Sequence, residues 1–129
     1  MDNLAKIKIG RLTDEITSQL RKYSQVIADD VEQIMDDVTK EAVGRIKSKI
    51  QEVGLVQTGD YMRGWARKRV PNGWVIHNKT EYRLAHLLEY GHATVDGRRV
   101  QGTPHIRPVE DWLEKEFEDR VEKAIKNET

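Results

Sequence analysis

The chain of 129 residues has no cysteine, only three prolines and few aromatic side chains. The absence of cysteine excludes disulfide bonds, a thiol nucleophile and a zinc site with cysteine ligands. No apolar run approaches the roughly 20 residues that a transmembrane helix needs, so we expect no contact with a membrane. The sequence also shows no signal peptide, and we expect a cytosolic-type product.

Apolar side chains are scarce for a globular protein, and charged ones are abundant. Charged residues make up 34% of the chain and hydrophobic residues 37%, whereas charged residues are about 25% of an average domain. The length suits one domain with a modest core. Because small domains bury a small fraction of their surface, we expect this one to complete its burial against partners.

The charges are unevenly distributed, although the net charge is zero. Residues 11–60 carry seven basic and ten acidic side chains, residues 61–107 nine and three, and residues 108–129 four and eight. Such asymmetry concerns partners rather than fold. The basic middle segment can face nucleic acid, or it can face the acidic C-terminal segment of the same chain or of a neighbouring copy.

The first half of the chain predicts one long helix over residues 13–53. Apolar side chains recur every three or four residues from Ile16 to Val53, which places them on one stripe. Thr13 suits the N-cap and Gly54 the position just past the end. At about 1.5 Å per residue this helix exceeds the width of the domain, so it either breaks near Gly44 or projects toward a partner. We expect residues 1–12 to be flexible.

Residues 58–80 predict a loop followed by a hairpin. The strands are expected at residues 65–70 and 74–79, because Pro71-Asn72-Gly73 between them has the composition of a tight turn. A lone hairpin is marginal in water. This one therefore leans on the long helix, gains a strand from elsewhere in the chain, or pairs with another subunit.

Two further helices are expected in the second half. The first spans residues 81–90, between Thr80 as its cap and Gly91 as its stop, and its apolar residues on more than one side predict a well-buried helix. A mobile loop rich in glycine and arginine follows at residues 92–105. The last helix, residues 108–126, opens at Pro108 and has apolar residues at a spacing of four. The prediction is a single α+β domain with a long N-terminal helix, a small antiparallel sheet, a buried middle helix and a C-terminal helix.

Histidines offer one candidate for catalysis. His86, Glu89 and His92 are spaced three apart, and His105 follows the loop, so a zinc-dependent hydrolase is one hypothesis. However, Gly91 interrupts the helix, and the His-Glu-x-x-His pattern is missing. Phosphate-binding glycine loops and the Gly-x-Ser-x-Gly motif are missing as well. The sequence therefore favours a protein without catalytic, cofactor or metal sites, in which Glu89 is an exposed helix residue or an intersubunit contact.

Three motifs occur in a characteristic order: Thr58-Gly59 followed by Arg63, then Leu88-Glu89-Tyr90-Gly91, then Pro104-His105-Ile106-Arg107-Pro108. On these motifs the chain resembles the head–tail joining (neck) and minor tail protein family of long-tailed bacteriophages, the Hong Kong ninety-seven type. The resemblance covers about residues 5–125. The chain departs from the family's pattern at Tyr61, Met62 and Gly64, since the family tends to have a leucine and then a small polar residue there.

The resemblance implies a non-enzymatic virion assembly protein without a cofactor. Such a protein forms or joins a ring at the neck or the head-proximal end of the tail, contacts other neck and tail proteins, and resides in the host cytoplasm during assembly. The residues expected at interfaces or structural turns are Thr58, Gly59, Leu88, Glu89, Tyr90, Gly91, Pro104, Arg107 and Pro108.

Two hypotheses concern the charged segments. In the first, the acidic helix 108–126 of one subunit approaches the basic region 61–107 of the next. In the second, a basic set lines a lumen and makes transient, sequence-independent contacts with DNA phosphates; its members are Arg67, Lys68, Arg69, Arg98 and Arg99. A small basic-patch nucleic-acid-binding module is the alternative function, ahead of the metal-dependent hydrolase.

Overall fold

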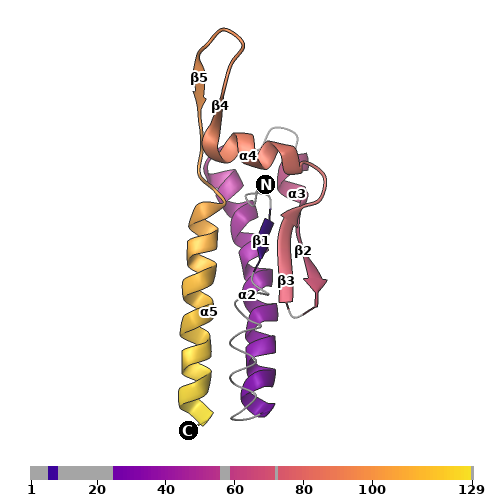
Figure 1. The fold of residues 1–129 in the computed structure, drawn as a ribbon, viewed down its shortest axis with the longest axis vertical. Coiled ribbons are helices and arrows are strands. Elements are labelled where there is room, and N and C mark those ends of the chain that lie inside the picture. Colours follow the sequence, from indigo (N-terminus) through magenta and orange to yellow (C-terminus); the bar gives the residue numbers. More distant parts are fainter. Residues whose placement is uncertain (1–5, 9–24, 56–58, 72, 129) are drawn as a thin grey trace.

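The computed structural model describes residues 6–8, 25–55, 59–71 and 73–128 (Figure 1). It has a mixed α+β architecture, as predicted. The elements in chain order are β1 (Lys6–Lys8), α2 (Gln25–Glu52), α3 (Asp60–Arg63), β2 (Trp65–Val70), β3 (Gly73–Asn78), α4 (Tyr82–Tyr90), β4 (Gly91–Ala93), β5 (Arg99–Gln101) and α5 (Arg107–Glu128).

The long helix α2 is the central element of the core. Its predicted apolar stripe is confirmed over the described residues, and the buried side chains include Ile27, Val31, Val38, Ala42, Ile46 and Ile50. The helix continues through Gly44, which lies on the exposed face, so the break considered there does not occur. It ends before Gly54, whose φ of +77° is the left-handed conformation expected past a helix end. The predicted start of the helix, with Thr13 as its N-cap, lies outside the described residues.

The C-terminal helix α5 lies alongside α2 (Figure 1). It buries side chains at the predicted spacing of four, namely Val109, Leu113, Phe117 and Val121. Polar contacts flank this apolar seam: Arg120 pairs with Glu41 of α2 at 2.7 Å, and the guanidinium of Arg45 lies 4.0 Å from the ring centre of Trp112. The two helices therefore form one packed layer.

The sheet has three antiparallel strands in the order β1-β3-β2. Trp65 lies opposite Asn78 and Val70 opposite Gly73, which confirms the predicted hairpin. The hairpin both packs against α2 and gains a strand, since β1 pairs with β3 from Lys6 opposite His77 to Lys8 opposite Val75. No strand was predicted in residues 1–12, and their expected flexibility stays a prediction.

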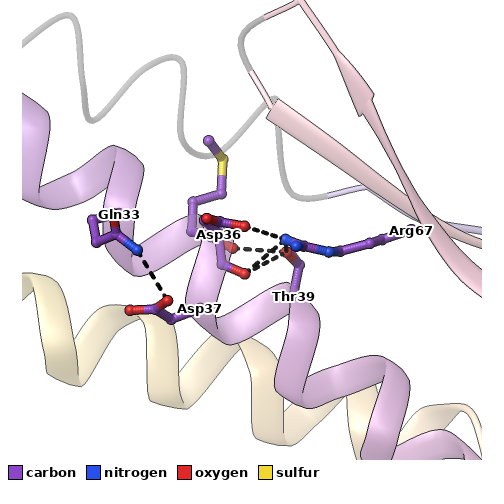
Figure 2. Close-up of polar contacts among 6 residues, drawn as sticks. Gln33, Asp36, Asp37, Thr39 and Arg67 are labelled. Carbon is purple, nitrogen blue, oxygen red and sulfur yellow. Dashed lines mark hydrogen bonds and ion pairs between the residues drawn. The ribbon is translucent and has the colours of Figure 1, made fainter.

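Arg67 fastens the sheet to α2 (Figure 2). Its guanidinium donates to the Asp36 carboxylate, to the Asp36 carbonyl oxygen at 2.8 Å and to Thr39 Oγ1 at 3.2 Å. The hydrogen bond from Arg67 lowers the pKa of Asp36 below its usual value. The same guanidinium lies 4.0 Å from the ring centre of Trp74, a cation–π distance. The contact between Arg67 and Asp36 joins residues that are 31 positions apart in the sequence.

The prediction of a well-buried middle helix is wrong. Helix α4 has the predicted extent, but it lies across the end of the helical layer (Figure 1), and only one of its sides faces the protein. Ala85 and Glu89 are its buried residues. Its outer side leaves four large side chains 39–53% exposed: Tyr82, Leu84, Leu87 and Tyr90.

The segment 92–105, predicted to be a loop, contains part of a second small sheet. Strands β4 and β5 pair antiparallel, with Gly91 opposite Gln101 and Ala93 opposite Arg99. The resulting hairpin projects beyond α4, away from the rest of the molecule (Figure 1). We call residues 91–102 the arm. Within the described residues, no helix is both long and apolar enough to cross a membrane.

Candidate functional site

The Glu89 carboxylate joins the end of α4 to the beginning of α5. Oε1 accepts hydrogen bonds from the backbone N–H groups of His105 and Ile106, both at 2.8 Å, and Oε2 accepts from Arg107 N–H at 3.0 Å. The first N–H groups of a helix lack partners inside the helix, and they carry its positive partial charge. Glu89 is 3% exposed, so the prediction of an exposed or intersubunit residue is wrong. It is a buried cap for α5.

Hydrogen bonding keeps this buried carboxylate ionised. Burial raises the pKa of Glu89, but hydrogen bonds from the His105 side chain and from the three N–H groups outweigh it and lower the pKa to about 2. At neutral pH the group is therefore a fixed anion. It does not hold a proton for general acid catalysis.

His105 carries the contact onward to α3. Its ring is fully buried, and Nδ1 lies 2.8 Å from the Thr103 carbonyl oxygen and 3.1 Å from Glu89 Oε1. Both of these neighbours are acceptors, so Nδ1 bears the proton, and in the neutral ring Nε2 accepts from the Tyr61 hydroxyl at 2.6 Å. Burial raises the pKa of Tyr61 above its usual value, which keeps the hydroxyl a donor.

Asn78 holds the other end of α4. It is 2% exposed, and its Nδ2 donates to the Tyr61 carbonyl oxygen at 2.7 Å. Its Oδ1 accepts from Thr80 N–H at 3.2 Å and from Glu81 N–H at 2.7 Å, just before the helix. Thr80 is therefore not the cap. A Cβ on Gly64 would lie 2.4 Å from Asn78 Oδ1, so a glycine at this position makes room for the contact.

Gly91 and Gly102 allow the two ends of the arm to cross in direct contact. Gly91 ends α4 as predicted, with φ at +82°. A Cβ on Gly91 would lie 2.1 Å from the Val100 carbonyl oxygen, and one on Gly102 would lie 2.5 Å from the Glu89 carbonyl oxygen. Thr103 N–H then donates to the Leu88 carbonyl oxygen at 2.7 Å. We call this assembly around Tyr61, Asn78, Glu89, Gly91 and His105 the junction.

A family model matches residues 14–91, more than half of the chain, and its description reads "Bacteriophage HK97-gp10, putative tail-component". The chain belongs to this family of phage tail components. The match includes α2, α3, β2, β3 and α4 and ends at Gly91, at the base of the arm. No curated protein and no solved structure matches the chain.

The junction of this tail component brings the three motifs together. Glu89 of the second motif binds the backbone of the third, and Tyr61, two residues after Gly59, binds His105. Gly59 is buried with φ at +88°, whereas Thr58 lies outside the described residues. Leu88 is half-buried, whereas Gly91 and Ile106 are buried. The exposed residues of the motifs are Arg63, Tyr90, Pro104, Arg107 and Pro108. Asn78 was not among the predicted site residues, although an Asn just before a helix is a recognisable local signal. His105 was considered only as a metal ligand, and its contacts with Glu89 and Tyr61 were not predicted.

The histidines of this tail component do not gather around a metal site. The ring of His86 contacts Tyr90 with 5.6 Å between centroids, and His92 is exposed on β4. Glu89 instead faces His105 and the start of α5. In the part of the chain that the structure describes, no group of three or more histidine, aspartate or glutamate side chains is arranged to hold a metal ion.

The basic residues lie in two separate places. Arg67 is bound to α2, while Lys68 and Arg69 are exposed beside it on β2. Arg98 and Arg99 lie on the arm, at the far end of the molecule from the β2–β3 turn (Figure 1). One chain therefore does not assemble the five cations into one patch, and their place in a DNA lumen stays a prediction.

The junction predicts a pH-dependent contribution of Glu89 to stability. Its folded pKa of about 2 lies below the unfolded value of about 4.3, so the stabilisation is complete above pH 5 and is lost as the pH falls toward 2. We expect Glu89→Gln to reduce the free energy of unfolding by about 2–3 kcal/mol at pH 7. We expect the difference in the free energy of unfolding between Glu89→Gln and the parent, measured by urea denaturation, to become smaller below pH 5. The control is Glu118→Gln, because Glu118 is exposed on α5. If the loss of unfolding free energy caused by Glu89→Gln stays constant with pH, the account is contradicted.

The glycines predict a graded series of stabilities. Gly91→Ala places a side chain at positive φ and against the backbone of residues 100–102. We therefore expect it to lower the free energy of unfolding, measured by thermal unfolding, by at least about 2 kcal/mol. Gly97 has φ at +86° but open space around it, and Gly97→Ala should cost about 1 kcal/mol. Gly44→Ala lies in α2 with nothing nearby and should stabilise by about 0.5–1 kcal/mol. Equal effects at Gly91 and Gly97 would rule out the close crossing.

Proposed function

We propose that this tail component is a structural ring subunit, without catalytic activity, at the neck or the head-proximal end of the tail. There it acts in head–tail joining or tail completion, with copies of itself and other neck and tail proteins as partners. Membership of the tail-component family supports the proposal. The observation that carries it is the placement of two oppositely charged surfaces on opposite sides of α2.

One surface is α5, and the other is the sheet. In Figure 1, α5 lies on one side of α2, and the β2–β3 hairpin lies on the other. Residues 108–129 have eight acidic and four basic side chains, whereas β2 presents exposed Lys68 and Arg69. Because the rigid core separates them, these surfaces are available to two different neighbours.

Such an arrangement favours a head-to-tail contact. When one surface of a subunit meets a different surface of the next, repetition gives a closed ring if the rotation closes. Here α5 of one copy approaches β2 of the next, as the charge asymmetry of the sequence suggests. The exposed outer side of α4 adds apolar area that a single chain leaves in water, and neighbours in a neck or tail can cover it.

Deletion of the gene from the phage tests this role by electron microscopy of the lysate. We expect DNA-filled heads and separate tails that do not join, because the missing ring belongs between them. Expression of the intact chain in trans should restore joined particles, and an empty vector is the matched control. Joined, infective particles without the chain would contradict the proposal, and so would a lysate with heads but no tails.

A further inference from the structure

The geometry points to a specific contact between neighbouring copies: the tip of the arm of one copy inserts into a hollow beside α3 and α4 of the next. This inference rests on the proposed ring and adds the segments that interlock. The partner is a second copy of this chain.

The arm is a hydrogen-bonded hairpin with one exposed valine in its turn and another on β5. Val95 is fully exposed and Val100 is 45% exposed. The turn is held by Thr94 N–H, which donates to the Arg98 carbonyl oxygen at 2.8 Å, and the base is held by Arg99, which donates to the Tyr90 carbonyl oxygen at 2.8 Å. A hairpin held by such hydrogen bonds loses less conformational entropy on binding than a loop without them. A valine presented on such a projection is suited to insertion into another surface.

The receiving hollow lies between the end of α2, α3 and the flank of α4, and has a volume of about 230 Å³. Its lining combines apolar side chains with two carboxylates: Leu55, Met62, Leu84, Leu88, Asp60 and Glu81. Recognition sites typically have apolar walls with a few polar groups that fix orientation. The hollow therefore suits an apolar side chain accompanied by a cation.

Charge and geometry identify the occupant. The arm carries Arg98 and Arg99 against a single acid, Asp96, which pairs with Arg98 at 3.1 Å. The hollow offers Glu81, together with Asp60, which also binds Arg63 at 2.5 Å. Exposed pairs of this kind steer and orient a contact more than they strengthen it.

The arm cannot fill the hollow of its own chain. It leaves the C-terminal end of α4 and points away from the body of the molecule (Figure 1), whereas the hollow lies against α3 and the flank of α4. The arm also begins at the end of α4 that is nearest to α5, whereas α3 lies near the other end of α4, next to the β2–β3 hairpin (Figure 1). One head-to-tail arrangement therefore brings α5 toward β2 and the arm toward the hollow together.

Disulfide trapping in phage particles tests the contact, because the chain has no cysteine of its own. We use purified particles whose only copy of the chain carries both Val95→Cys and Leu84→Cys. Mild oxidation should give a ladder of cross-linked multimers on a denaturing gel, detected by immunoblot. The matched control pairs Val95→Cys with Lys115→Cys, an exposed position on α5, and should remain monomeric on the gel.

The outcomes separate this inference from the proposed function. Joined particles that contain the chain but give no ladder above the control would overturn the arm contact and leave the ring role intact. Joined particles that lack the chain would overturn the proposed function, and with it the contact.

A second pair of variants does not depend on cysteine. Val95→Asp should reduce the number of joined particles by about tenfold or more, since it removes an apolar insertion at each contact. Val95→Thr keeps the branched shape and should have a smaller effect. Val95 is fully exposed, so neither change disturbs the core of the chain. Equal yields for Val95→Asp and the parent would contradict the proposal.

Discussion

The structure depends most on the ionised carboxylate of Glu89, buried against the first N–H groups of α5. An isolated charge in a protein interior is costly, so it persists only where donors surround it. Three backbone N–H groups and the His105 ring supply those donors, and in return the carboxylate satisfies helix groups that would otherwise lack partners. This one contact fixes where α5 begins relative to the end of α4 and to the base of the arm.

The junction and the Arg67 contact together make one rigid unit from elements distant in sequence. Tyr61 and Asn78 connect α3 and β3 to the junction, and Arg67 fastens β2 to α2. In the proposed ring this rigidity matters, because α5 and the arm lie at one side of the molecule while β2 and α3 lie at the other (Figure 1), and the hollow is beside α3. Two fixed and different surfaces are what a head-to-tail ring requires.

Periodic elements could be predicted from the sequence, and contacts to the backbone could not. The structure confirms three elements that have a local sequence pattern. They are the apolar stripe of α2, the apolar residues at a spacing of four in α5, and the β2–β3 hairpin with its turn at Pro71. By contrast, β4 and β5 have three residues each, too few to establish an alternating pattern. The apolar residues of α4 do not reveal which side of that helix faces the core. Glu89 carries no local sign of burial, because its partners are backbone N–H groups sixteen to eighteen residues later. The motifs identified both halves of the junction without showing that they touch.

Amide hydrogen exchange tests the central claim most directly. The N–H groups of His105, Ile106 and Arg107 precede or begin α5, where they would exchange quickly without a capping group. The account predicts that, in the purified protein near neutral pH, these three amides exchange as slowly as the amides in the middle of α5. Exchange at the rate of an unprotected helix N-terminus would show that the Glu89 carboxylate does not hold the junction, and would contradict the account.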